Sequence, residues 1–142
     1  MEYSVVIDPE RIDEELKGLS PFNLANDIKA IKKDFPQFKL ERIAEEIANE
    51  IMIGPHNSTY VVLYICKSDK NINYSKIRTE DSERKKGKSN GYRAIVLIDH
   101  NNRYAILLHI YRHGHGPDSL SKKEKNIVEK LIEEYSKCVN SI

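Results

Sequence analysis

Two segments in the first sixty residues repeat apolar residues at helical spacing. The spacing predicts one helix over residues 20–35 and a second over residues 39–54, joined by a short connection. Ser20-Pro21 fits the start of the first helix, and Gly54-Pro55 ends the second. The apolar stripes are Leu24, Ile28, Ile31 and Phe35 in the first helix and Leu40, Ile43, Ile47 and Ile51 in the second. We expect the two helices to form an acidic, antiparallel pair.

Elsewhere the pattern changes to the β-branched and aromatic runs that are typical of strands. Residues 3–7 predict a short edge strand, which ends at Asp8-Pro9 and leads into a helical turn through Leu16. Four further strands are expected over residues 60–66, 72–78, 91–99 and 103–112. Residues 99–102 have the composition of a hairpin turn, so the four strands are predicted to form an antiparallel meander.

The last part of the chain predicts a C-terminal helix. Ser121 and Glu124 stand at the spacing of a capping box, and the apolar residues from Ile127 to Tyr135 recur at helical spacing. With 142 residues, the chain has the length of one domain, residues 1–142. The order of elements predicts an α+β fold, with an N-terminal strand and helix pair and a C-terminal helix. These helices are expected on one face of a largely antiparallel sheet of four to five strands.

Opposite charges are segregated along the chain although the net charge is only +1. Residues 1–60 carry 7 Lys and Arg against 12 Asp and Glu, a balance of −5. Residues 67–93 carry 9 against 4, a balance of +5, and their segment 81–90 has no large apolar residue and predicts an exposed loop. A basic block of this kind is expected in a protein that binds a polyanion, although a solvated basic loop has the same composition.

Several classes of protein are disfavoured by the pattern. No apolar run approaches the roughly 20 residues that a membrane span needs, and the N-terminus lacks the basic start and apolar core of a signal peptide. We therefore expect a cytoplasmic protein with no membrane partner. Cys66 and Cys138 show no metal or redox spacing, and the glycines match no phosphate-binding loop, so no cofactor is expected.

The side chains best suited to catalysis lie between residues 74 and 115. Alternate residues of a strand share a face, so Lys76 and Arg78 are expected opposite Ile77, and Tyr111 on the same face as His113. Cleavage of RNA by the ribose 2′-OH needs a base, an acid and positive charge near the phosphate, which these residue types supply without a metal. The predicted catalytic residues are Arg78, Arg93, Tyr111, His113 and His115, and the predicted RNA-binding residues are Lys76, Arg84, Lys85, Lys86, Lys88 and Arg112.

Each of these residue types suits a different part of the reaction. His113 and His115 are the expected proton-transfer groups, because imidazole titrates near neutral pH. The two arginines, Arg78 and Arg93, carry the planar fork that binds phosphate oxygens, and Tyr111 can stack on a base or orient the substrate.

Structural explanations stand beside these functional ones. Lys76 and Arg78 also suit solvated strand positions or ion pairs with the helices, and residues 84–88 also suit a loop that is merely soluble. His109 follows three apolar residues and fits a hydrogen-bonded histidine in the core, or just below the surface, better than a catalyst. His113 and His115, with only an aspartate nearby, fall short of a metal-ligand set, so no metal site is predicted.

Four motifs follow one another in residues 72–135. They are Lys76-Ile-Arg78, Gly87-Lys-Ser-Asn-Gly-Tyr-Arg-Ala-Ile95, Ala105-Ile-Leu-Leu-His-Ile-Tyr111 and Leu120-Ser-Lys-Lys-Glu124. In this order they resemble the RelE/ParE superfamily of toxins from type II toxin–antitoxin systems, and the RelE-like and HigB-like members in particular. By position, the resemblance implies phosphate contacts for Lys76, Arg78 and Arg93, assistance from Lys88, and strand-end catalytic positions for Tyr111 and His113.

The resemblance also implies a function and partners. Such a toxin has a RelE-like ribonuclease fold and is a metal-independent endoribonuclease, an mRNA interferase that inhibits translation and growth. It cuts mRNA, often on the ribosome, and is neutralised by a cognate antitoxin protein in a hetero-oligomer. Two alternatives remain open. One is a ParE-type toxin of the same fold that poisons DNA gyrase without nuclease activity, and the other is a non-enzymatic RNA-binding module.

Overall fold

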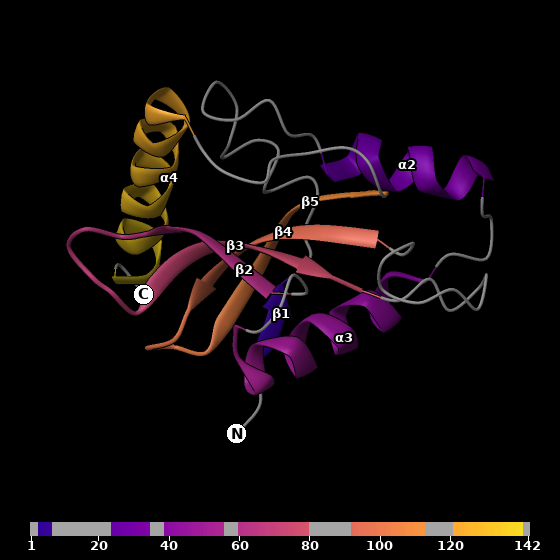
Figure 1. Cartoon of the computed structure of the whole chain (residues 1–142), viewed down its shortest axis with the longest axis horizontal. Coiled ribbons are helices and arrows are strands. Elements are labelled where there is room, and N and C mark those ends of the chain that lie inside the picture. The colour runs from indigo at the N-terminus through magenta and orange to yellow at the C-terminus, as the bar shows by residue number, and fades with distance from the viewer. Residues whose placement is uncertain are drawn as a thin grey trace.

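The computed structural model describes residues 3–6, 24–34, 39–55, 60–79, 92–112 and 121–140. Within these ranges, five strands form one mixed sheet and three helices lie against it (Figure 1), which confirms the predicted α+β class. The strands are β1 (Ser4–Val6), β2 (Tyr60–Ile65), β3 (Ile72–Arg78), β4 (Tyr92–Asp99) and β5 (Tyr104–Arg112). The helices are α2 (Leu24–Asp34), α3 (Leu40–Ile53) and α4 (Lys122–Asn140).

The sheet has the strand order β1-β5-β4-β3-β2. Strands β2 to β5 form the antiparallel meander that the sequence predicts, and β1 adds a parallel edge strand beside β5. Every residue of the central strand β4 is buried. This explains why β4 reads as a nearly continuous apolar run, because a strand covered on both faces has no solvated face to carry polar residues.

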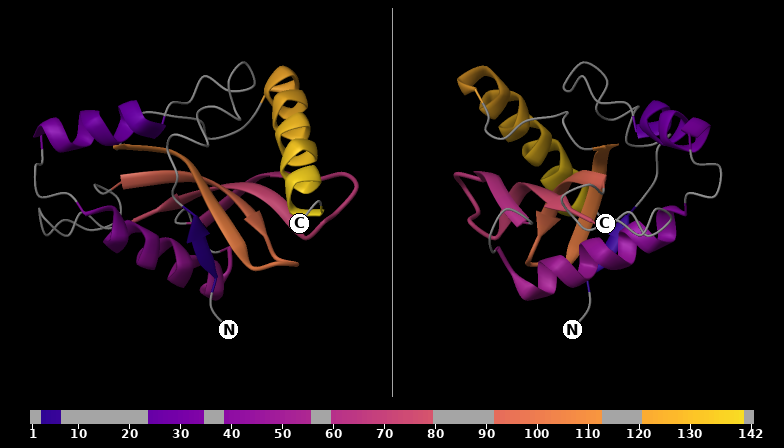
Figure 2. Two further views of the ribbon diagram at one scale, coloured as in Figure 1. Left: turned by 180° about the vertical axis from the view of Figure 1, so that it is seen from behind. Right: turned by 45° about the vertical axis from the view of Figure 1, so that its right-hand side comes forward.

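Helices cover both faces of the sheet, so the prediction that they pack on one face is wrong (Figures 1 and 2). Helix α3 packs on one face, here called the α3 face, where it contacts β1 and β3. Helix α4 lies over the other face, here called the α4 face. It is held there by hydrogen bonds from Tyr135 Oη to Asp99 Oδ2 (2.6 Å) and from Tyr64 Oη to Glu129 Oε1 (3.0 Å). The reason for the difference is β4, since an apolar central strand needs cover on both sides.

The first two described helices are not the antiparallel pair that we expected. Within the described residues, α2 contacts β5, whereas α3 contacts β1 and β3, and Figure 2 shows the two helices on opposite sides of the sheet. Strand β1 pairs with residues 104–106 of β5. Further along β5, the backbone N–H of Ile110 donates a hydrogen bond to Asp27 of α2 (3.3 Å). Each helix therefore packs against the sheet instead of the other helix, and α2 covers a stretch of β5 beyond β1.

The boundaries of the strands agree with the sequence to within one or two residues, and β3 has the predicted bounds. Gly54 ends α3 in a left-handed conformation (φ 92°), which fits its glycine. The predicted cap at Ser20-Pro21, the turn through Leu16 and the loop at residues 81–90 lie outside the described residues.

The capping box of α4 is confirmed. The Ser121 N–H donates to Glu124 Oε1 (3.0 Å), and the Glu124 N–H donates to Ser121 Oγ (3.2 Å). These hydrogen bonds to Ser121 hold the pKa of the Glu124 carboxyl below its ordinary value. In the described ranges, no helix combines the length and the apolar character that crossing a membrane requires.

Asp99 joins the turn after β4 to helix α4. Its carboxylate accepts hydrogen bonds from the backbone N–H groups of Asn101 (2.9 Å) and Asn102 (3.2 Å), from Asn102 Nδ2 (2.7 Å) and from Tyr135 Oη (2.6 Å). Burial alone would raise the pKa of Asp99, but these hydrogen bonds to the charged form outweigh it and leave the pKa below its ordinary value of 3.8.

Asp99 should therefore make folding sensitive to acid. Because its pKa is lower in the folded chain, its contribution to stability is present above the unfolded pKa of about 3.9 and is lost as the pH falls through the folded pKa. We expect Asp99→Asn to lower the unfolding free energy at pH 7 by about 1–3 kcal/mol, with the difference from wild type shrinking below about pH 4. Urea unfolding between pH 2.5 and pH 7 measures this. A difference that stays constant over the range would contradict the assignment.

Candidate functional site

A row of cationic and aromatic side chains crosses three strands on the α4 face. Arg78 of β3 pairs with Arg93 of β4, and Arg93 pairs with Tyr111 of β5, so the three side chains share one face. Lys76 lies two residues before Arg78 and faces the same way. The structure thus brings together Lys76, Arg78, Arg93 and Tyr111, here called the basic row, as the alternation along the strands predicts.

A β-bulge in β5 sets which side chains join the basic row. Val96 pairs with Leu107, whereas the adjacent Ile95 pairs with His109, so Leu108 is an extra residue in β5. The extra residue reverses the alternation of side chains, and the bulge places His109 and Tyr111 together on the α4 face. Bulges that redirect a side chain in this way are over-represented beside active sites.

His109 lies beside the basic row and contacts two other side chains. Its Nδ1 is 2.5 Å from Oδ2 of Asp27 on α2, and its ring stacks on Tyr111 with the ring centres 4.9 Å apart and the planes at 24°. The side chains of His109 and Asp27 are 18% and 17% exposed. His109 is therefore a hydrogen-bonded histidine just below the surface, as the sequence favoured, and it is also a neighbour of Tyr111.

The basic row lies between helices α2 and α4, which stand on the same side of the sheet in Figures 1 and 2. On the α2 side, Asp27 reaches His109. On the α4 side, burial together with the charge of Glu124, in the first turn of the helix, raises the pKa of the Tyr74 phenol, which stays protonated at neutral pH. The row therefore has an acidic residue at each flank, with a neutral phenol next to it.

Burial differs among the members of the row. Lys76 and Arg93 are each 4% exposed and Tyr111 is 8% exposed, whereas Arg78 has an intermediate exposure. Ile95 is fully buried and lies between Lys76 and His109 in the pairing register, so it contributes an apolar side chain to the same face. An anion that approaches this face meets Arg78 more readily than the other two cations.

Comparison with protein-family models, with curated proteins and with solved structures finds no match. The proposals for this chain therefore rest on its own residues and their geometry.

The remaining predicted site residues are placed less fully. Arg112 is the residue after Tyr111 in β5, and its backbone pairs with Tyr92 of β4. The predicted residues that lie outside the described ranges are His113, His115, Arg84, Lys85, Lys86 and Lys88. Their proposed catalytic and RNA-binding roles stay predictions.

Sequence reasoning missed Asp27. Nothing in the sequence connects the first turn of the helix at residues 24–34 with a strand eighty residues later, so only the fold reveals this contact. The sequence did contain a signal for His109. His109, Tyr111 and His113 are alternate residues of one strand, so they are expected on one face. Leu107 and Leu108, the apolar neighbours of His109, obscured that signal.

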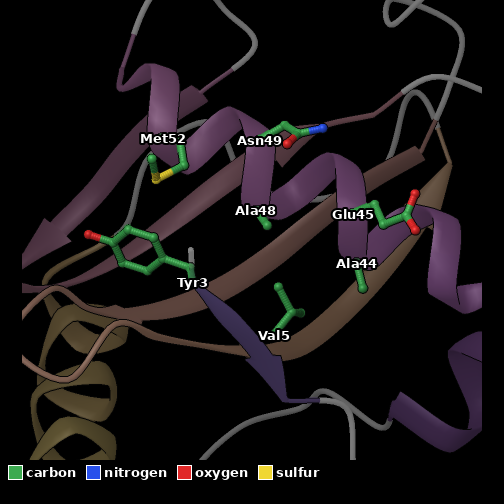
Figure 3. Close-up of a pocket in the computed structure, with 7 residues that line it drawn as sticks. All are labelled: Tyr3, Val5, Ala44, Glu45, Ala48, Asn49 and Met52. Carbon is green, nitrogen blue, oxygen red and sulfur yellow. The ribbon is translucent and has the colours of Figure 1, made fainter. Parts of the chain in front are cut away.

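Two other features of the described residues do not join this site. No group of three or more His, Cys, Asp or Glu in the described ranges is placed to hold a metal ion. A groove of about 560 Å³ lies between β1 and α3 on the opposite face of the sheet (Figure 3). Its lining contains one charged residue, an acidic one, and no member of the basic row; the residues are Tyr3, Val5, Ala44, Glu45, Ala48, Asn49 and Met52.

Proposed function

We propose that this chain is the toxin of a type II toxin–antitoxin system and acts as a RelE-like endoribonuclease. The observation that carries the proposal is the basic row, in which Arg78 and Arg93 lie directly opposite one another with Tyr111 completing the line. The order of sequence motifs supports the same function, because three of the four motifs contribute residues to this row.

The placement of like charges favours an anion-binding role. Arg78 and Arg93 lie directly opposite each other on neighbouring strands, and a third cation, Lys76, stands two residues along on the same face. A phosphate bound at this face would be attracted by these cations, and the planar guanidinium groups suit its oxygens.

The chemistry that this face supports is transesterification of RNA. The 2′-oxygen of a ribose attacks the adjacent phosphorus, the bond from phosphorus to the 5′-oxygen breaks, and the products are a 2′,3′-cyclic phosphate and a 5′-hydroxyl. Arg78 and Arg93 stabilise the negative charge that grows on the phosphate oxygens. Tyr111 orients the substrate or stacks on a base. No step requires a metal ion.

The proposed partners follow from the same assignment. The substrate is mRNA, bound on the ribosome, and a cognate antitoxin protein neutralises the chain by covering the basic row. Because Lys76 and Arg93 are buried in the free chain, substrate binding has to uncover them. Arg78, the more exposed member, makes the first contact with RNA in this account.

Salt dependence of RNA binding tests the proposal. A cationic side chain that neutralises a phosphate releases counterions, so each such side chain adds about 0.7 to the slope of log K against log salt concentration for single-stranded RNA. We expect Arg78→Gln to reduce the slope by about that amount, measured by fluorescence anisotropy with a labelled oligonucleotide.

A matched control is available on the opposite face. Arg42 is an exposed arginine of α3, and Arg42→Gln should bind RNA with the wild-type affinity and slope. An equal reduction in both variants would mean that binding depends on net charge alone. If the wild type failed to bind RNA at low salt, the proposed function would be wrong, and induction of DNA breaks would then favour the gyrase-type alternative.

A further inference from the structure

We propose that His109, oriented by Asp27, is the proton-transfer group of this site. The inference rests on the proposed ribonuclease function and deepens it by assigning roles to two residues that are not among the predicted catalytic residues. Asp27 is a positioning residue that acts through His109, whereas His109 itself acts on the substrate.

The geometry around Asp27 fixes the orientation of the imidazole. One oxygen of Asp27, Oδ2, lies 2.5 Å from His109 Nδ1 and also 3.3 Å from the backbone nitrogen of Ile110, the next residue of β5. An ionised carboxylate only accepts hydrogen bonds, so the Nδ1 atom of His109 carries the proton in this contact. The carboxylate is itself held by the strand that carries His109. Helix α2 and strand β5 thus hold the ring at a defined angle.

This orientation suits the imidazole to act as a base. With the proton on Nδ1, the lone pair of the neutral ring is on Nε2, the other ring nitrogen. A carboxylate at Nδ1 also stabilises the imidazolium that forms when Nε2 takes a proton, as in other aspartate–histidine pairs. The pair therefore supplies both the tautomer and the charge compensation that proton abstraction needs.

The position of the ring connects the pair with the basic row. His109 stacks on Tyr111, and Tyr111 is the cross-strand partner of Arg93. The backbone partner of His109 is Ile95, two residues along β4 from Arg93, so the imidazole shares a face with the arginine that is assigned to the phosphate. Both side chains of the pair keep nearly a fifth of their surface exposed, in contrast to the buried Lys76 and Arg93.

The proposed step balances without a further cofactor. His109 Nε2 takes the proton of the ribose 2′-hydroxyl while the bond from the 2′-oxygen to phosphorus forms. The bond from phosphorus to the 5′-oxygen breaks, and the leaving oxygen takes a proton from water. The hydroxide left behind is neutralised by the proton that His109 received, and the site returns to its starting state.

The test separates a catalytic role from a structural one through the variant His109→Asn. The asparagine amide can still donate a hydrogen bond to Asp27 from nearly the position of Nδ1, but it cannot take up a proton. General bases contribute about 10²–10⁴-fold to rate, so we expect kcat for RNA cleavage to fall at least a hundredfold. The Kd for RNA should stay within about twofold of wild type. His109→Ala should be slowed as much, with part of the rate restored by added imidazole.

Asp27 has its own expected signature. Asp27→Asn should lower kcat more than it changes KM, and Asp27→Glu should restore part of the rate, because a carboxylate again faces Nδ1. The matched control is His100→Ala. His100 lies in the turn after β4 and contacts Tyr3 and Asn73, away from the basic row, so its removal should leave kcat unchanged.

The outcomes distinguish this inference from the proposed function. A wild type that cleaves RNA, with a folded His109→Asn variant that cleaves at the same rate, would overturn the inference and leave the ribonuclease intact. A wild type that cleaves no RNA, with or without ribosomes, would overturn the proposed function and the inference with it.

Discussion

Replacing Arg93 by methionine should reduce the rate of RNA cleavage by about 10²–10³-fold. Removal of one preorganised donor from a site where negative charge develops has an effect of this size. Arg93 occupies the centre of the basic row, between Arg78 and Tyr111, and its side chain is 4% exposed. Methionine has a similar length and suits a buried position, so the variant should fold. Single-turnover cleavage of a labelled mRNA, with ribosomes present, measures the rate.

The control for this substitution is Arg42→Met on the α3 face, which should cleave at the wild-type rate. Circular dichroism and the melting temperature establish that each variant is folded. If Arg93→Met retained full activity in a folded protein, the row would have no part in cleavage. A bacterial culture that expresses the wild type or Arg42→Met should stop growing, whereas a culture that expresses Arg93→Met should continue to grow.

The substitution Ile95→Ala should produce the largest reduction of stability, about 2–5 kcal/mol in unfolding free energy. Ile95 is fully buried in the central strand, where it pairs with Lys76 on one side and His109 on the other. Truncation removes apolar packing on the α4 face and leaves a cavity beside the basic row. Urea unfolding, followed by circular dichroism, measures the change.

The same substitution at Ile53 provides the comparison. Ile53 ends α3 and is 67% exposed, so Ile53→Ala should change the unfolding free energy by less than about 0.5 kcal/mol. Equal reductions at the two positions would contradict the central placement of β4. A reduction at Ile95 alone, accompanied by slower RNA cleavage, would also show that the packing of Ile95 supports the site.

Strand identity could be predicted from the sequence because each strand of the meander carries its own local signal. The run at residues 72–78 is bounded by polar residues and became β3 without a change of bounds, and the Asp99 turn occurs where its composition suggests. The capping box of α4 is equally local, since the hydrogen bonds that form it join only Ser121 and Glu124.

The arrangement of the helices could not be predicted in the same way. An apolar stripe shows that a helix buries one side, but it does not show against which surface. The stripe of α3 could pack against α2 or against the sheet, and the choice depends on the long-range fact that β4 needs cover on both faces. Helix α2 is placed by a contact with β5, through Asp27, that no local pattern encodes.

The candidate site shows the same division. Alternation along β3 correctly put Lys76 and Arg78 on one face, because side-chain alternation is a property of any regular strand. The bulge at Leu108 interrupts that regularity in β5, so residues before and after it follow opposite alternation. The Asp27–His109 contact depends on the bulge and on α2 together, which is why sequence reasoning missed the aspartate.

The measurement that tests the central claim most directly is the chemistry of the RNA ends made by the purified wild-type chain. A labelled mRNA is incubated with the chain in two reactions. One contains ribosomes, and the other contains no ribosomes and a metal chelator. The new RNA termini are then analysed in both. Our account predicts fragments that end in 2′,3′-cyclic phosphate and begin with 5′-hydroxyl, and their absence with Arg93→Met. Intact RNA in every wild-type reaction, or fragments with 5′-phosphate ends, would contradict it.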